Sequence, residues 1–263
     1  MSVRTVVISG GTDGMGLALA RARAAQGDTV VALGSSAEKG RRLAGIGHFL
    51  QVDLSDVEDT RRVVSRLKES WPQIDALALF ANRQGPRREE NRQGLERTFA
   101  LYYLSRYLLG QAYRDSAGLI VNVAGVGVTK GTIAWDDLQL TSGYGMIRAQ
   151  LQAGRLNDLL GVAQSGGKAR YVLYHPGFTR SGDMSTLPAP LRAAIKIAAK
   201  VKARSVEESI RPVETWIDNP PPAPLTAVDR DRELPLTLPT LDGGDAHRLA
   251  SSTQQLLRDA ARD

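Results

Sequence analysis

The sequence predicts an α/β fold in which one doubly wound parallel sheet carries helices on both faces. Short apolar runs rich in β-branched residues alternate with longer amphipathic segments from residue 5 to residue 175, and this alternation is typical of such a sheet. A glycine-rich turn directly follows the first apolar run. With 263 residues, of which 42% are hydrophobic, the chain is long enough to bury one sizeable core.

Strands are expected where short apolar runs end at residues that interrupt a strand. These runs are residues 5–8, 29–33, 48–52, 74–80, 118–123 and 170–174. The segments between them predict helices, in which apolar residues recur at helical spacing. The helices are expected over residues 17–26, 38–42, 56–71, 92–109 and 144–163. Gly27 and Pro72 end the first and the third of these helices.

The pattern changes after Gly177. Two further helices are predicted over 187–201 and 205–217, and the segment 184–217 is interpreted either as a helical lid over a substrate or as structural packing. Residues 218–263 form a C-terminal extension, with a proline-rich stretch, an irregular part over 225–242 and a terminal helix over 245–261. Because the sequence has no internal repeat and no second domain pattern, residues 1–263 are predicted to form a single domain.

Composition narrows the class of protein. The formal net charge is +6, but no basic stripe interleaved with aromatic residues predicts nucleic-acid binding. No run approaches the ~18 apolar residues of a membrane span. The chain has no cysteine, so disulfides and thiol chemistry are excluded and a cytoplasmic location is expected. The three histidines lie far apart in the sequence, which predicts no metal site. They are His48, His175 and His247.

The turn after the first strand is the clearest candidate site. Glycines let the backbone turn tightly and approach a ligand, and the following helix N-terminus offers free N–H groups and a positive dipole end to a pyrophosphate. An ordinary strand-to-helix turn is the alternative, but the position after a buried strand near residue 1 favours a nucleotide site. The candidate cofactor-binding residues of the turn are Gly10, Thr12, Asp13, Gly14, Met15 and Gly16.

Four motifs in the right order resemble the short-chain dehydrogenase/reductase family over roughly residues 3–180. Residues 9–16 resemble the family's TGxxxGxG turn, with Ser9 in place of threonine. The pair Asp53-Leu54, the run 120–123 and the run 176–179 resemble the motifs after the third strand, in the fifth strand and after the sixth strand. The resemblance implies a Rossmann-like domain that binds NAD(P) and moves a hydride between its nicotinamide and a carbonyl or alcohol carbon.

The resemblance also implies which other residues contact the cofactor. Asp53 is expected at the adenine, with Leu54 beside it, and the segment 79–82, which replaces the family's NNAG at the end of the fourth strand, is expected to contact the cofactor. Members of the family usually place the loop after the sixth strand against the nicotinamide. These further residues are Ala81, Asn82, Pro176, Gly177 and Thr179.

The end of the second strand indicates which nicotinamide cofactor is used. NAD-preferring members usually carry an acidic residue there, whereas this chain has Ser35 and Ser36. These serines suit a 2′-phosphate, helped by Lys39 or Arg42, although each of these cations alone is more simply interpreted as a solvated helix residue. Asp13 acts against the preference, because an acid near the phosphate repels it. NADP(H) is therefore expected over NAD(H).

The catalytic set that the family uses is incomplete in this chain. The serine that positions the carbonyl falls on Ala124 or Gly125, and Tyr102 takes the place of the asparagine in the long helix. No Tyr-x-x-x-Lys follows the fifth strand, although in the family that tyrosine gives or takes the proton. Tyr102 is therefore held as the reserve proton donor.

Two alignments compete for the missing tyrosine and lysine. The first uses Tyr144 as the acid and Arg148 as the residue that orients it; these two share one helix face. The second starts from residues 131–138, which resemble retinol-dehydrogenase-like members, and leads to Gln150 and Gly154. Positions 144 and 150 differ by about 240° around a helix, so the two pairs cannot both face the nicotinamide. The second alignment is favoured, while counting back from the Pro-Gly motif mildly favours the first.

The function expected from the sequence is an NADP(H)-dependent oxidoreductase with a non-standard catalytic set, acting on a small carbonyl or unsaturated natural-product-like substrate. Two alternatives stay open: a non-redox cyclase, isomerase or dehydratase, and an inactive nucleotide-binding protein. A small-molecule substrate is the expected partner, with neither nucleic acid nor membrane. The resemblance leaves homodimer or homotetramer open, through the helices at 92–109 and 144–163.

Overall fold

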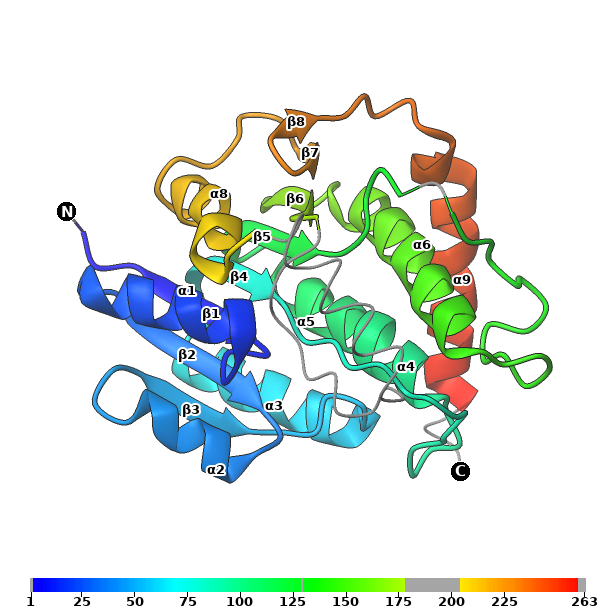
Figure 1. The fold of residues 1–263 in the computed structure, drawn as a ribbon, viewed down its shortest axis with the longest axis horizontal. Helices are drawn as coiled ribbons and strands as arrows, with labels where there is room; N and C mark the ends of the chain where they lie inside the picture. The colour runs from blue at the N-terminus through cyan, green and yellow to red at the C-terminus, as the bar shows by residue number, and fades with distance from the viewer. Residues whose placement is uncertain (1, 129, 178–203, 260–263) are drawn as a thin grey trace.

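The structure is a computed structural model that describes residues 2–128, 130–177 and 204–259 (Figure 1). Those residues form an eight-stranded sheet in the order β3-β2-β1-β4-β5-β6-β7-β8, parallel throughout except for β8. Its strands are β1 Thr5–Ser9, β2 Thr29–Gly34, β3 His48–Gln51, β4 Ile74–Leu79, β5 Ala117–Val123, β6 Arg170–His175, β7 Leu225–Asp229 and β8 Arg232–Glu233. The order reverses between β1 and β4, which places a crevice at the carboxyl ends of these strands.

Helices cover both faces of the sheet, as the sequence predicts for a doubly wound fold. Figure 1 shows α1 and α8 together on one face, and α9 alongside α6 on the other. The α-helices are α1 Gly14–Ala25, α2 Ala37–Gly40, α3 Val57–Ser70, α4 Arg97–Phe99, α5 Ser105–Tyr113, α6 Met146–Gln164, α8 Val206–Asp218 and α9 Gly243–Asp259. The remaining helical turns are η1 Arg41–Leu43, η2 Ala100–Leu104 and η3 Pro239–Leu241, of which η2 is a π-helix.

The strands feed two apolar cores because neighbouring side chains point to opposite faces. Val6 and Ile8 pack on the face covered by α1 and α8, whereas Val7 packs on the other face. Strands buried on both faces are expected to be continuously apolar, and residues 6–8 of β1 and 76–79 of β4 have this composition. The predicted fold class is therefore confirmed.

Two predicted segments differ in the structure. The helix expected over 92–109 begins at Arg97, because the carboxylate of Glu96 accepts hydrogen bonds from the N–H groups of Thr98 and Phe99 and caps the helix there. It then continues through η2 into α5. The segment expected to be irregular over 225–242 contains β7 and β8. The interpretation overlooked β7 because the prolines before it and the polar ends of the strand hide a short apolar centre.

Only the second half of the predicted lid can be described, since residues 184–203 lie outside the described ranges. That half, α8, packs Ile210, Val213 and Ile217 into the core beneath α1. Its end is tied to α1 by Arg23, which is fully buried and pairs with Asp218 at 3.0 Å. The described part of the segment therefore has a packing role, and a lid over the substrate stays a prediction.

The C-terminal extension closes the other side of the molecule. Leu249 of α9 is buried in a cluster with Tyr103, Leu156 and Leu160. The hydroxyl groups of Tyr103 and Thr253 are hydrogen-bonded at 2.6 Å. The helix thus covers the outer face of α6 and η2. Among the described helices, none is long and apolar enough to cross a membrane.

Candidate active site and cofactor crevice

The glycine turn is packed too closely for a side chain at Gly10 or Gly16. The N–H groups of Gly10 and Gly11 both donate to the Leu33 carbonyl, at 2.9 and 3.1 Å. Gly10 has φ +72°, and a Cβ there would lie 2.9 Å from the Cα of Ala81. A Cβ at Gly16 would lie 2.2 Å from the Gly10 carbonyl oxygen. The turn therefore keeps its backbone open at the N-terminus of α1, a cradle that suits a pyrophosphate.

Asp13 joins this turn to the end of β2. Its carboxylate caps α1 by accepting from Gly14 N at 2.9 Å, and it pairs with Lys39 Nζ at 2.5 Å and Arg42 at 3.3 Å. The hydrogen bond from Lys39 lowers the pKa of Asp13 despite partial burial. The three charges predicted to influence cofactor choice are thus together, and Ser36 lies beside them as the N-cap of α2.

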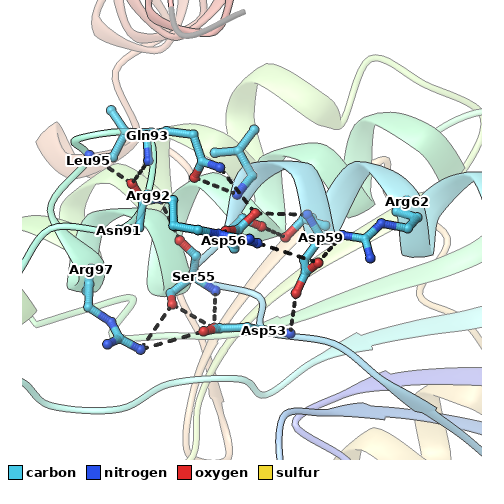
Figure 2. Close-up of polar contacts among 12 residues, drawn as sticks. Asp53, Ser55, Asp56, Asp59, Arg62, Asn91, Arg92, Gln93, Leu95 and Arg97 are labelled. Atoms are coloured by element: carbon cyan, nitrogen blue, oxygen red, sulfur yellow. Dashed lines mark hydrogen bonds and ion pairs between the residues drawn. The ribbon is translucent and has the colours of Figure 1, made fainter. Parts of the chain in front are cut away.

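Asp53 lies at the end of β3, on the edge of the polar pocket in Figure 2. Its carboxylate accepts from the backbone N–H of Ser55 at 2.9 Å and from its hydroxyl at 2.6 Å. Arg97 approaches it at 3.6 Å, but the side chain stays 47% exposed. Leu54 is buried in the core. Asp53 can therefore still accept a hydrogen bond from a ligand, whereas Leu54 shapes the site by packing.

The rest of this pocket is an ion-pair network that sequence reasoning missed. Asp56 caps α3 and pairs with Arg92 at 2.7 Å. Burial acts to raise the pKa of Asp56, but hydrogen bonds from Asp59 N, Arg92 and Gln93 lower it overall. The network fastens the loop before α4 to the start of α3. The lining residues are Asp53, Ser55, Asp56, Asp59, Glu90, Asn91, Arg92 and Arg97.

Two predicted residues meet at the end of β4. The Asn82 amide donates to the Gln150 side-chain oxygen at 3.1 Å, and Gln150 comes from the first turns of α6. Ala81, just before Asn82, is buried against the glycine turn. Gly154 lies one turn beyond Gln150, and a Cβ there would meet no described atom within 4 Å outside the neighbouring backbone of α6. In the second alignment the position of the family's tyrosine is therefore occupied by Gln150, which lies beside Asn82 at the end of β4.

The two residues of the first alignment have different hydrogen-bond partners. The Tyr144 hydroxyl donates to the Gly85 carbonyl at 2.8 Å, and burial raises the pKa of Tyr144. Arg148 donates to the carbonyls of Ser142 and Gly143 at 3.1 and 2.8 Å. Gly145 is extended and α6 begins only at Met146, so Tyr144 precedes the helix. The described contacts therefore do not join the Tyr144 and Arg148 side chains.

Tyr102 lies between the end of β5 and α6, where it contacts Ala124 and Ala153. The Arg106 guanidinium lies 4.5 Å from the centre of its ring, and burial raises the pKa of the Tyr102 hydroxyl. Arg106 is itself fully buried and donates to the carbonyls of Ala81 and Val123 at 3.0 and 2.8 Å. This arginine ties the ends of β4 and β5 together. The sequence signal for it was a charge one helical turn after Tyr102 in an apolar segment.

The last predicted motif follows β6. Gly177 packs against Arg230, since a Cβ there would lie 3.0 Å from its Nε, and Pro176 precedes it at the carboxyl edge of the sheet. Thr179 lies outside the described residues. Sequence reasoning did not include His175 in the site, yet its Nδ1 lies 3.0 Å from Oδ1 of Asp229. In the described ranges no group of acidic, histidine or cysteine residues could hold a metal ion.

These features fit a nicotinamide dinucleotide. The turn has room only for glycine at its closest points, and helix α1 starts directly behind it. Asp53 and Asn82 end strands on either side of that turn, because β3 and β4 flank the β2–β1 pair in the sheet. The carboxyl edge thus offers backbone donors for phosphates and side-chain acceptors farther along the same crevice.

Comparisons with known proteins support this assignment. A family model described as short chain dehydrogenase matches residues 4–136. A protein of Streptomyces sp. (strain C5) named "Putative daunorubicin C-13 ketoreductase DnrU" is 28% identical over 289 residues, covering 98% of this chain and 94% of that protein.

Solved structures share the fold. A crystal structure from Mycobacterium paratuberculosis has a TM-score of 0.73 at 20% identity and covers 97% of this chain and 93% of its own. A short chain dehydrogenase from Burkholderia cenocepacia J2315 in complex with NADP has a TM-score of 0.65 at 18% identity. The match covers 87% of this chain and 96% of that one. The family match favours redox chemistry over the two alternatives that the sequence left open. The chain belongs to the short-chain dehydrogenase family of oxidoreductases.

Proposed function

We propose that the protein is an NADP(H)-dependent ketoreductase that acts on a small, natural-product-like carbonyl compound. The observation that carries the proposal is the glycine cradle with Lys39 and Arg42 at its mouth. A relative that aligns over nearly the whole chain is named as a ketoreductase, which supports a carbonyl group as the reacting function.

The preference for NADP(H) rests on charge near the end of β2. The residues directly after β2, Ser35 and Ser36, are not acidic, and Lys39 and Arg42 both reach the N-terminus of α1. Both cations are engaged by Asp13, so a 2′-phosphate has to compete with this carboxylate for them. A phosphate carries more charge than a carboxylate and offers three acceptor oxygens, which favours the exchange.

The remaining contacts follow from the same crevice. Backbone N–H groups of the glycine turn suit the pyrophosphate, Asp53 suits the adenine, and Asn82 with Gln150 suits the nicotinamide ribose. A bound nicotinamide supplies or accepts the hydride. Pro176 lies in the loop expected beside it.

The proton donor is less defined by these contacts. Under the first alignment Tyr144 is the acid and Arg148 the residue that orients it, and Tyr102 is the reserve. Turnover measured on Tyr144→Phe and Gln150→Ala separates the two alignments: loss in the first variant supports Tyr144, and loss in the second supports Gln150 at the crevice.

Calorimetric titration with NADPH and NADH tests the cofactor proposal. We expect NADPH to bind at least about tenfold more tightly, because two charge-assisted contacts are gained. A double variant with Lys39→Ala and Arg42→Ala should lose the preference for NADPH, while its affinity for NADH should stay the same. Lys68→Ala is the matched control, since Lys68 bonds Pro72 and Ser116 at another part of the chain. Equal affinities would contradict the NADP preference, and failure to bind either nucleotide would contradict the proposed function.

A further inference from the structure

Three residues lie side by side where β5, β6 and β7 end. The β5–β6 ladder pairs Val123 with Tyr174, and Ala124 N donates to the Tyr174 carbonyl at 2.9 Å. The next position along β6 is His175, which therefore neighbours Ala124. On its other side His175 pairs with Asp229 of β7. Neighbouring strands are about 4.8 Å apart, so the histidine lies one strand from Ala124 and one strand from a carboxylate.

These side chains share the face of the sheet that α5 and α6 cover. In β6, Tyr171 and Leu173 belong to the core on that face, and His175 follows at the same alternation. Ala124 contacts Tyr102 and Ala153, which come from η2 and α6. His175 is thus placed on the side of the crevice from which α6 contributes Gln150.

The histidine is held in one orientation. Its Nδ1 lies 3.0 Å from Oδ1 of Asp229, and both side chains are 22% exposed. A carboxylate only accepts hydrogen bonds, so Nδ1 carries the proton of that bond. Nε2 is left as the ring nitrogen that can exchange a proton with a ligand.

The described residues leave space next to this pair. Ala124 has only a methyl group, and a Cβ at Gly125 would meet no atom of the described residues within 4 Å. The loop then returns to the pair, since a Cβ at Gly127 would lie 3.4 Å from the Cβ of Asp229. The loop after β5 and the pair at the end of β6 therefore border the same small-residue region.

We propose that His175, oriented by Asp229, is the group that exchanges a proton with the oxygen of the reacting carbonyl. This inference rests on the proposed function. In reduction, the Nε2–H bond of the imidazolium breaks and an O–H bond forms with the electron pair that leaves the C=O double bond. His175 becomes neutral, and the carbonyl carbon would gain the hydride that a bound nicotinamide would supply on its two-electron oxidation. Alcohol oxidation reverses each change.

The charged groups facing His175 set its protonation. Burial lowers the pKa of His175, and Asp229 acts in the opposite direction. Arg230, which lies 3.8 Å from Asp229, lowers it further. The imidazolium that reduction requires is therefore favoured on the acid side of neutrality, and the rate of reduction should fall as pH rises through the pKa of His175.

The first test needs no cofactor. Nitrogen-15 NMR titration of the whole protein follows three imidazole rings, and His175→Gln identifies the signal of His175. We expect neutral His175 to carry its proton on Nδ1. Asp229→Asn, which keeps an acceptor but removes the charge, should lower the pKa of His175, whereas His247→Gln should leave it unchanged. A proton on Nε2, or no change in Asp229→Asn, would overturn the pairing on which the proposal depends.

The second test measures reduction of phenanthrenequinone by NADPH across pH, together with calorimetric affinity for NADPH. His175→Gln should lose about 100-fold or more in rate, as expected for a lost general acid, while its NADPH affinity and melting temperature stay close to wild type. Asp229→Asn should shift the fall in rate to lower pH. A His175→Gln variant that keeps the wild-type rate and pH profile would overturn the proposal. Failure of the wild type to bind NADPH would instead count against the proposed function.

Discussion

The two ends of the crevice present different kinds of groups: backbone at one end and side chains at the other. At the β1–α1 turn the site is backbone: Gly10 and Gly16 leave no room for a Cβ, and two N–H groups share the Leu33 carbonyl. At the ends of β5 and β6 the site is made of side chains, with Tyr102 beside Ala124 and His175 beside Asp229.

This difference offers a physical reason for the prediction that one end keeps the family pattern and the other departs from it. A backbone cradle depends on glycine at fixed positions, because another residue there collides with main-chain atoms. A side-chain site can exchange one donor for another if the neighbouring strands hold the new group in place. The sequence accordingly contains the glycine turn, whereas the family's serine, asparagine, tyrosine and lysine are predicted to be replaced.

Gly16→Ala should have the largest effect, because its Cβ would lie 2.2 Å from the Gly10 carbonyl oxygen and neither backbone can move freely. We expect a loss of about 3 kcal/mol in the free energy of unfolding and no measurable NADPH binding. Gly125→Ala, at the catalytic end, meets no atom of the described residues within 4 Å of its Cβ and should unfold like wild type. Urea denaturation and calorimetry measure both variants. A stable, NADPH-binding Gly16→Ala protein would break the distinction between the two ends.

Leu249→Ala tests what supports the catalytic end. Leu249 is 1% exposed and packs α9 onto α6, so its truncation should cost about 2 kcal/mol, near the low end for buried leucine because a surface helix can shift. NADPH affinity of the folded protein should be unchanged, since the glycine turn lies elsewhere. Gln254→Ala, exposed on the same helix, is the control for urea unfolding. Weakened NADPH binding in Leu249→Ala would show that the two ends are coupled.

More of the cofactor end than of the catalytic end could be predicted from the sequence, for a physical reason. Strand alternation and the spacing of Gly10, Gly14 and Gly16 are local, so they predicted the fold and the cradle. The His175–Asp229 pair joins residues 54 positions apart, and it depends on β7, a strand that polar and proline neighbours hid in the sequence. The ion pairs of Asp13 and Asp56 likewise depend on which loops meet, which no local pattern states.

Asp13→Asn should have the smallest effect. It tests whether Asp13 competes with a 2′-phosphate for Lys39 and Arg42 at the cofactor end. The amide oxygen can still cap α1, but the charge that engages Lys39 and Arg42 is gone. Because these pairs are largely exposed, their attraction is weak and screened, so NADPH affinity should rise only about threefold to tenfold and NADH affinity should stay the same. The gain should shrink in high salt, since screening reduces both the repulsion by Asp13 and the attraction by the two cations. Calorimetry at two salt concentrations measures this, with Asp115→Asn as the control at an exposed site on another loop. Equal gains for NADPH and NADH would mean that Asp13 acts on the shared pyrophosphate and not on the 2′-phosphate.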